Sequence, residues 1–452
     1  MGTQTTTPQA SGLPGATGAH RQRDLLRLAT AGSVDDGKST LIGRLLYDTK
    51  SVLADQLAAV QKASHARGGE AVDLALLTDG LRAEREQGIT IDVAYRYFST
   101  ATRAFVLADT PGHVQYTRNM VTGASTAELA VVLVDARRGV LEQTRRHAAL
   151  AALLRVPHIV LAVNKMDLVD YAEDVFTEIA DEFAAYAARL GVLGVRAIPV
   201  SALAGDNVVE RSARMPWHTG PTLLEHLEQV PVLRDPATEQ LRFPVQYVIR
   251  PRTPEHPDYR GYAGRVSSGV VAVGDEVATV PGGGRSRVVG IDTFDGPLGL
   301  AHAPQSVTLR LEDDLDVARG DVLVTAGTPA TVGTDLRGTV CWLAQTPGAP
   351  GQRVLVRTGT RTVRGVVQEV GARLDVDTLE LEPSSGSLTL NAIGTVRVLL
   401  AEPVLLDDFA EHRRTGTFLL VDPFDGTTLA AGMVGRSPLA DAVELSGRCR
   451  EQ

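Results

Sequence analysis

The strongest constraint on this chain is the run Gly32-Ser33-Val34-Asp35-Asp36-Gly37-Lys38-Ser39, which fits the pattern G-x-x-x-x-G-K-[ST]. An apolar run over residues 25–31 precedes it, and residues 39–47 have helical spacing. In such a strand–loop–helix unit, backbone N–H groups cradle phosphates and the helix N-terminus adds a positive field. We predict a phosphate-binding loop with contacts from Gly32 through Ser39 to Thr40. Lys38 would reach the β- and γ-phosphates, and the Ser39 hydroxyl would bind Mg²⁺.

The alternation of short apolar runs with helical patterns predicts an α/β domain around this loop. Short apolar runs at 25–31, 105–108, 129–134, 159–163 and 197–200 alternate with helical patterns at 39–47, 143–155 and 174–190. Continuous apolar strands separated by helices are typical of a parallel sheet covered on both faces. Residues 91–98 come closer to polar–apolar alternation, which favours an edge strand.

From about residue 241 the helical patterns stop and short Val-rich runs recur between Gly, Pro and Asp turns. This pattern is typical of small closed β-barrels, and a link near 326–335 separates two such segments. The predicted fold is therefore an α/β P-loop domain followed by two all-β barrels. We expect a disordered tail at 1–22, the P-loop domain at 23–232, barrels at 240–328 and 335–436, and a tail at 437–452.

Two further motifs follow predicted strand ends. Asp109-Thr110-Pro111-Gly112 is by itself a common turn, but at a strand end facing a P-loop Asp109 can hold Mg²⁺ through water. Gly112 lets its N–H approach the γ-phosphate. His113 follows directly and is either structural or the residue that orients the attacking water.

The second motif is Asn164-Lys165-Met166-Asp167, after the run 159–163. The Asp167 carboxylate can accept the N1 and exocyclic amine hydrogens of guanine, a donor pair that adenine lacks. Asn164 would orient the base loop and the Lys165 stem would lie on the ring, with Ser201, Ala202 and Leu203 forming a further turn against the base. Only four of the 45 basic residues are lysines, and Lys38 and Lys165 fall within these motifs.

Composition excludes several classes of protein. No apolar run approaches the ~18 residues of a membrane helix, so we expect no membrane association. The formal net charge of −9 gives no overall attraction to nucleic acid. Cys341 and Cys449 cannot build a disulfide scaffold or a zinc site, and they favour a cytoplasmic protein.

Taken together, the motifs resemble the translation-factor class of GTPases, in which elongation factor Tu combines a GTPase domain with two β-barrels. Several stretches resemble one branch more closely, the GTP-binding large subunit of bacterial sulfate adenylyltransferase. These stretches, read from the sequence, are residues 43–50, 55–60, 79–98, 115–126, 390–394, 415–418 and 430–433.

That resemblance implies a GTP hydrolase that acts as the energy-coupling subunit of sulfate adenylyltransferase (EC 2.7.7.4). A separate catalytic small subunit, in a heterodimer or higher assembly, makes adenosine 5′-phosphosulfate and pyrophosphate from ATP and sulfate. Val34 and Ile89 match an apolar gate beside His113. Thr90 is expected to be the mobile Mg²⁺ ligand, although as bare sequence its segment also fits a charged helix end.

This chain departs from the elongation-factor pattern in ways that bear on its branch. Ser33 and Asp36 stand where elongation factors carry histidines, which favours the sulfate branch, while Val114 stands where that branch is expected to have a polar residue. The alternative function is a translation-type GTPase that delivers an RNA. Net charge does not decide between the two, because an RNA-binding face can be local.

Overall fold

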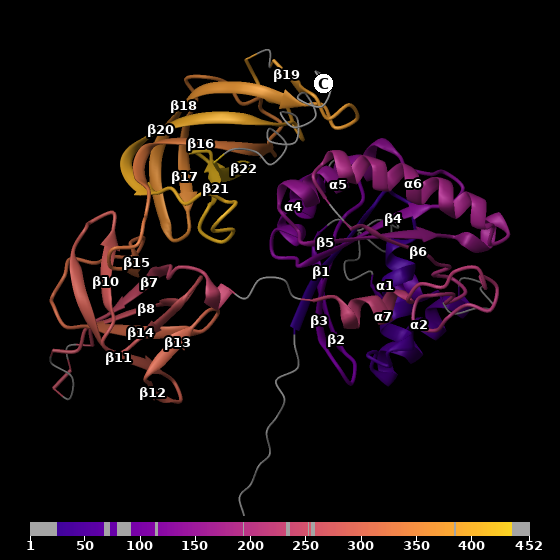
Figure 1. Cartoon of the computed structure of the whole chain (residues 1–452), viewed down its shortest axis with the longest axis horizontal. Helices are drawn as coiled ribbons and strands as arrows, with labels where there is room; N and C mark the ends of the chain where they lie inside the picture. Colours follow the sequence, from indigo (N-terminus) through magenta and orange to yellow (C-terminus); the bar gives the residue numbers. More distant parts are fainter. Residues whose placement is uncertain are drawn as a thin grey trace, which may run out of the picture.

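The computed structural model describes residues 25–66, 73–78, 92–113, 116–192, 194–231, 236–251, 253–254, 258–383 and 386–435. Figure 1 shows an α/β domain beside two β domains. The tails expected at 1–22 and 437–452 lie outside the described residues. Among the described helices, none is both long and apolar enough to cross a membrane.

The α/β domain is built on a sheet whose described strands run in the order β2-β3-β1-β4-β5-β6. Parallel pairing joins β3, β1, β4, β5 and β6, whereas β2 pairs with β3 in the antiparallel sense at the edge. The expected edge strand is thus confirmed. The strands are β1 (Leu25–Gly32), β2 (Ala94–Ser99), β3 (Ala104–Asp109), β4 (Leu129–Asp135), β5 (His158–Asn164) and β6 (Arg196–Pro199).

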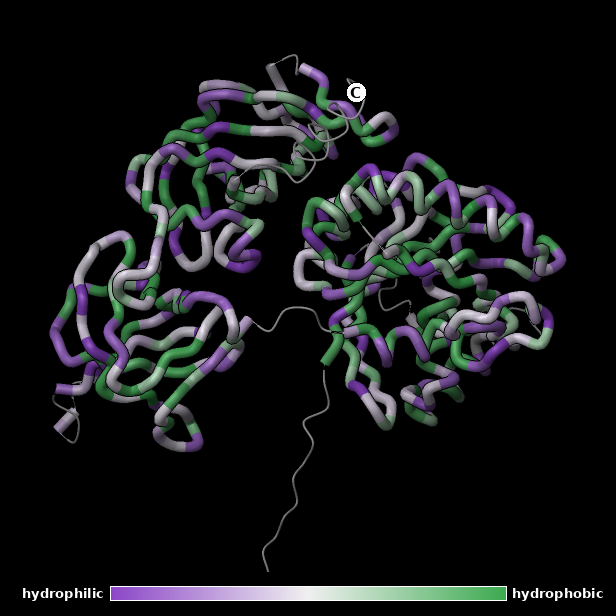
Figure 2. Tube along the Cα trace, viewed as in Figure 1, coloured by the Kyte–Doolittle hydropathy of each residue, from purple (hydrophilic) through white to green (hydrophobic). Residues whose placement is uncertain are grey.

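Helices cover both faces of this sheet, as the continuous apolar strands predict. One face packs against α4 (Thr117–Ser125), α5 (Glu142–Leu153) and α6 (Glu173–Arg189). The other packs against α1 (Lys38–Asp48) and α7 (Leu223–Gln229), with α2 (Ala54–Ala66) further out. Short 3-10 helices are η1 (Leu74–Leu77), η3 (Met166–Val169) and η4 (Pro236–Thr238). Figure 2 shows the hydrophobic residues concentrated on the central strands.

The first β domain is a closed barrel. Its strands follow the order β10-β15-β7-β8-β14-β11, and pairing of β10 with β11 closes the ring. The strands are β7 (Phe243–Ile249), β8 (Gly261–Arg265), β10 (Glu276–Val280), β11 (Arg285–Thr293), β14 (Ser306–Leu311) and β15 (Val322–Thr325), with short additions β9 (Val270–Ala272), β12 (Gly296–Leu298) and β13 (Leu300–His302). Closure removes exposed strand edges.

The second β domain is also a closed barrel, in the order β17-β21-β22-β16-β20-β18, with β17 paired to β18. Its strands are β16 (Val332–Trp342), β17 (Arg353–Thr358), β18 (Arg361–Leu374), β20 (Ile393–Leu405), β21 (Thr417–Val421) and β22 (Thr428–Val434), with β19 (Leu381–Glu382) beside β18. The link expected near 326–335 is shorter, because Val332 already pairs with Leu405. The two predicted β-barrels, one in each β segment of the chain, are therefore confirmed.

The domains contact one another through a buried ion pair, a hydrogen bond and a shared apolar cluster. Arg242 and Asp407, both almost fully buried, form a two-armed ion pair between the barrels, with N···O distances of 2.9 and 3.0 Å. On the α/β domain, the Tyr186 hydroxyl on α6 donates to the carbonyl oxygen of Val376 in the second barrel at 2.6 Å. Cys341, a buried free thiol, lies in an apolar cluster shared by these two domains.

Candidate functional site

The predicted phosphate loop connects β1 to α1 as expected. Gly37, at φ 92°, caps the start of α1, a left-handed conformation that glycine adopts without strain. The Lys38 ammonium is buried and donates to the carbonyl oxygens of Gly32 and Ser33, both at 2.8 Å. Asp36 stabilises the turn, because its Oδ2 accepts from the Ser33 N–H at 2.5 Å. The loop is thus held by its own side chains.

Burial sets the electrostatics of this loop. It lowers the pKa of Lys38, although Asp36 and Asp109 favour the charged form. Burial likewise raises the pKa of Asp36, against the opposing effect of Lys38. A buried ammonium whose hydrogen bonds go to backbone carbonyls is suited to a multiply charged anion, which would supply the compensating charge.

Two glycines keep the space beside Lys38 open. A Cβ at Gly112 would collide with the Lys38 ammonium and with the carbonyl oxygen of Gly32. A Cβ at Gly37 would collide with the side-chain amide of Asn164. The two predicted strand-end motifs therefore converge on the phosphate loop within contact distance. This close approach explains why glycine is needed at both positions.

Asn164 joins the phosphate loop to the loop that follows β6. Its Nδ2 donates to the Asp36 carbonyl oxygen at 2.8 Å, and its Oδ1 accepts from the Ala202 N–H at 3.0 Å. Asn164 is almost fully buried. One amide side chain therefore fixes the spacing between the phosphate loop and the Ser201–Leu203 turn. The carboxylate of Asp167 accepts from the Ser201 hydroxyl at 2.6 Å.

Lys165 is anchored by a residue that the sequence analysis did not single out. Its ammonium contacts the Asp135 carboxylate at 2.9 Å and the carbonyl oxygen of Asp35. Asp135 ends β4 and is 1% exposed, and Arg137 binds it in two-armed fashion at 2.7 and 3.0 Å. Burial opposes ionisation of Asp135, but hydrogen bonds from Arg137 and Lys165 outweigh it and hold the pKa of this carboxyl below its usual range. The sequence signal that could have identified Asp135 is an acidic residue directly at the end of a continuous apolar run.

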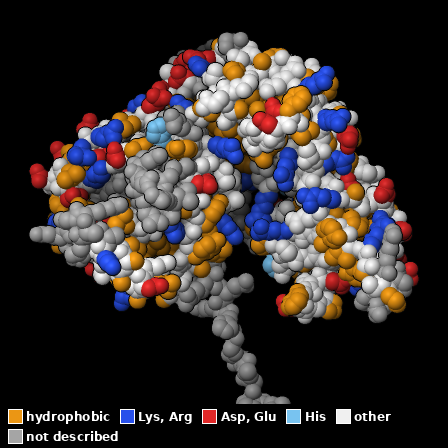
Figure 3. All heavy atoms as spheres, turned by 180° about the vertical axis from the view of Figure 1, so that it is seen from behind, with side chains coloured by type: hydrophobic (Ala, Val, Ile, Leu, Met, Phe, Trp, Pro, Cys, Tyr) orange, Lys and Arg blue, Asp and Glu red, His pale blue; other side chains and the backbone are white. Residues whose placement is uncertain are grey.

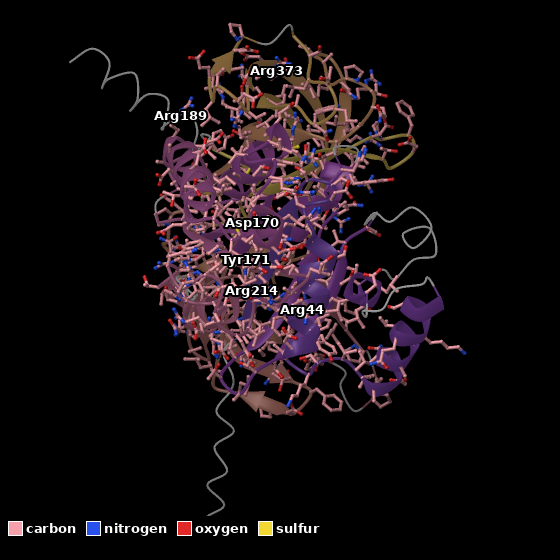
Figure 4. All side chains as sticks on the ribbon, turned by 90° about the vertical axis from the view of Figure 1, so that its right-hand side faces the viewer. Arg44, Asp170, Tyr171, Arg189, Arg214 and Arg373 are labelled. Carbon is pink, nitrogen blue, oxygen red and sulfur yellow. The ribbon has the colours of Figure 1, made fainter. Side chains whose placement is uncertain are left out.

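Arg44 is a second residue whose role was missed. From α1 it donates to the carbonyl oxygens of Ala202 and Leu203, at 3.2 and 2.6 Å. Figure 4 shows Arg44 on the same side of the α/β domain as Tyr171 and Arg214. The Tyr171 hydroxyl donates to Asp206 at 3.2 Å, which braces the segment after Leu203. The Ser201–Leu203 turn is therefore held from two sides.

The residues expected at the γ-phosphate are described in part. Asp109 ends β3 and is buried near enough to Lys38 to favour its charged form. His113 is half-buried, and its carbonyl oxygen accepts from the Tyr116 N–H at 2.9 Å. Val34 is half-buried in the phosphate loop. Ile89, Thr90 and Val114 lie outside the described residues.

His147 on α5 is a buried titratable group close enough to Lys38 to interact electrostatically. Its Nε2 lies 2.9 Å from the Gln143 amide. Burial, with repulsion from Lys38 and Arg146, lowers the pKa of His147 to about 3. The ring is therefore neutral near pH 7 and adds no positive charge to the site.

The oxygen donors near the loop suit a hard cation. Ser39 and Asp109 offer a hydroxyl and a carboxylate, the ligand types Mg²⁺ takes together with substrate phosphates. Among the described residues, no group of three or more His, Cys, Asp or Glu is placed to hold a metal ion. A softer metal with an all-protein ligand set finds no site in that part of the chain.

A phosphate loop tied to the Asn164–Asp167 strand end, followed by two closed barrels, defines a GTP-binding protein of the elongation-factor class. The family profile described as elongation factor Tu GTP binding domain matches residues 23–232, and one described as GTP-eEF1A C-terminal domain-like matches residues 335–435. A solved structure of sup35 complexed with GDP covers 92% of this chain and 94% of its own at 25% identity, with a TM-score of 0.41.

Curated relatives identify the branch. Sulfate adenylyltransferase subunit 1 of Cellvibrio japonicus is 51% identical over 92% of this chain and 87% of its own length. The same-named protein of Alteromonas mediterranea is 48% identical over 94% and 90%. The bifunctional enzyme CysN/CysC of Mycobacterium tuberculosis is 55% identical over 91% of this chain and 67% of its own length. The chain belongs to the sulfate adenylyltransferase subunit 1 family.

Proposed function

We propose that this chain is the GTPase subunit of a heteromeric sulfate adenylyltransferase. Hydrolysis of GTP drives the formation of adenosine 5′-phosphosulfate and pyrophosphate from ATP and sulfate on a separate catalytic small subunit. The observation that carries the proposal is the Asn164 bridge, which joins the phosphate loop to the base-reading turn in a chain about 50% identical to named subunits of this enzyme.

In this proposal, phosphate and base are read by different walls of the site. Residues 32–40 cradle the phosphates, with Lys38 released from the carbonyl oxygens of Gly32 and Ser33 to contact the β- and γ-phosphates. Asp167, aligned by the Ser201 hydroxyl, accepts two hydrogens from guanine. Lys165, held by Asp135, lies on the base, and the Ser201–Leu203 turn closes the pocket. Adenine would leave the half-buried Asp167 carboxylate without its donor pair, so the site selects GTP.

Hydrolysis is assigned to the residues around Gly112. His113 orients a water for in-line attack on the γ-phosphorus, and the bond from that phosphorus to the β–γ bridging oxygen breaks, giving GDP and phosphate. The Gly112 N–H approaches the γ-phosphate, and Val34 with Ile89 gates access of His113. Ser39, Thr90 and, through water, Asp109 would hold Mg²⁺, which neutralises charge on the phosphates.

The experiment that tests the function combines this chain with its candidate small subunit, ATP and sulfate. Adenosine 5′-phosphosulfate is measured with GTP, with GDP and with a non-hydrolysable GTP analogue. We expect product to rise with GTP hydrolysis and to stay low with the analogue. Product formation that is independent of GTP, by a small subunit that is otherwise active, would overturn the proposal. The RNA-delivery alternative is not favoured, because the named relatives are subunits of this enzyme.

A further inference from the structure

A cavity of about 630 Å³ lies where the three domains meet, away from the phosphate loop. The α/β domain contributes the start of β1, the end of α4 and the turn before β5, and each barrel contributes a loop or strand end. Five arginines line the cavity: Arg27, Arg155, Arg265, Arg413 and Arg414. Figure 3 shows basic side chains gathered around the hollow between the domains.

Three of the five arginines, Arg265, Arg413 and Arg414, donate to backbone carbonyl oxygens. Arg265 donates to the carbonyl oxygen of Pro304 at 3.0 Å, and Arg414 donates to that of Ser267 at 3.2 Å. Within the described ranges, no carboxylate lies within ion-pair distance of Arg27, Arg155, Arg265 or Arg414. Backbone carbonyl oxygens thus fix the direction of Arg265 and Arg414, and neither has a direct ion pair within the described residues.

The two glutamates of the lining offset the positive charge of the five arginines only in part. The Oε2 of Glu128 accepts from the backbone N–H of Arg27 at 2.9 Å, and Glu239 lies 3.9 Å from the Nδ1 of His412. Burial, with repulsion from Arg265 and Arg27, lowers the pKa of Arg414, and Glu239 and Glu128 offset this only in part. With five arginines against two glutamates, the lining carries a net positive charge that attracts anions.

We propose that this cavity binds a compact, multiply charged oxyanion of the pyrophosphate class. The planar arginine fork matches pairs of oxygens on tetrahedral phosphate or sulfate groups, and several arginines around one cavity can hold more than one such group. Hydroxyls of Thr126 and Ser267 in the same lining can donate to the remaining oxygens. The volume also accommodates a phosphosulfate group with an attached nucleoside.

A bound anion would hold the three domains together. Because the arginines come from all three domains, an anion that bridges them stabilises this domain arrangement over one in which the domains separate. Arg413 also donates to the carbonyl oxygens of Ala124, Ser125 and Ala127 around the carboxyl end of α4. That helix begins four residues after His113. Occupancy of the cavity is therefore linked through one side chain to the segment that follows Gly112.

Isothermal titration calorimetry on the full chain tests the site. The protein is first saturated with GDP, so that the phosphate loop is filled, and is then titrated with sodium pyrophosphate or, separately, with adenosine 5′-phosphosulfate. We expect saturable binding of at least one probe, and the comparison of the two shows whether the nucleoside adds affinity. Arg265→Gln and Arg414→Gln should each weaken binding about tenfold or more, the loss expected for one charged hydrogen-bond donor.

The matched control is Arg285→Gln, which removes an exposed arginine at the start of β11, outside the cavity. It should bind the anion within about twofold of the parent chain, and all three variants should bind GDP normally. The proposal would be overturned if neither probe bound saturably, or if Arg285→Gln weakened binding as much as the two cavity variants. The choice of probes rests on the proposed function. The calorimetry uses this chain without the small subunit. Failure of anion binding is therefore distinguishable from failure of sulfate activation, which is measured with the small subunit.

Discussion

The side-chain amide of Asn164 binds the carbonyl oxygen of Asp36 at 2.8 Å, so the end of β5 and the phosphate loop are one unit. Because its other amide atom accepts from the Ala202 N–H, the same residue also fixes the Ser201–Leu203 turn against the phosphate loop. Two motifs whose bonded residues are 128 positions apart, Asp36 and Asn164, are therefore held together by one side chain.

Asn164→Ala should weaken GTP binding about tenfold or more. The substitution leaves the Asp36 carbonyl and the Ala202 N–H without their buried partner, at a cost of about 1–3 kcal/mol each. Nucleotide affinity measured by fluorescence titration checks this. Gln246→Ala, at an exposed position in the first barrel, is the control and should keep parental affinity. Unchanged GTP affinity in Asn164→Ala would contradict the bridging role.

Asp167→Asn should shift preference from GTP toward xanthosine triphosphate. The amide can donate where the carboxylate could only accept, so it pairs with the additional carbonyl of xanthine and loses the guanine donor pair. Competition binding with both nucleotides measures the change. If guanine selectivity persists, Asp167 does not read the base.

His113→Ala should keep GTP affinity within about twofold and lose most hydrolysis, because the residue is assigned to the attacking water and not to nucleotide binding. Intrinsic hydrolysis by the parent chain is expected to be slow, below about 10⁻² s⁻¹, and to accelerate with the small subunit. Single-turnover hydrolysis and separate affinity measurements distinguish the two effects. A large loss of affinity would count against water positioning.

Asp407→Ala should destabilise the contact between the barrels by about 3–5 kcal/mol, since it leaves the Arg242 guanidinium buried without its ion-pair partner. Urea unfolding followed by circular dichroism measures this. Asp425→Ala, at an exposed turn position, should change the unfolding free energy by about 0.5 kcal/mol or less. Similar small effects at both positions would show that the buried pair adds nothing.

Acid sensitivity is expected from His147. Its folded-state pKa of about 3 lies below the ordinary histidine value of about 6.5. Between these values the unfolded chain binds a proton that the folded chain does not, so the unfolding free energy falls as the pH is lowered through that window. His147→Gln should lose less stability than the parent between pH 7.5 and 5.5. The exposed-site change His302→Gln should follow the parent chain. Identical slopes in parent and His147→Gln would contradict this.

Local motifs made much of the fold and site predictable. The phosphate loop, the Asn164–Asp167 turn and the short strands between turns in both barrels depend on contiguous residues, so sequence spacing alone indicates them. Contacts such as Asp135 with Lys165, or Arg44 with Leu203, join distant segments and leave no periodic signal. The same holds for the link between barrels, where pairing of Val332 with Leu405 overrides local turn character.

Among the α-helices of the described residues, three were not predicted, for different physical reasons. α4 is short and rich in Thr and Gly, and Gly123 is needed because a Cβ there would collide with the Thr110 methyl group. α7 begins with a capping box of Thr222 and Glu225, a sequence pattern that marks the start of a helix and that could have predicted it. In α2 few apolar positions repeat at helical spacing.

The most direct test of energy coupling uses Asp167→Asn together with the small subunit, ATP and sulfate. Adenosine 5′-phosphosulfate is measured with GTP and with xanthosine triphosphate as the driving nucleotide. We predict that the parent chain responds to GTP, and that the variant loses most of this response and gains one to xanthosine triphosphate. Product formation that ignores the nucleotide preference of this chain in both proteins would contradict the central claim that its GTP site drives sulfate activation.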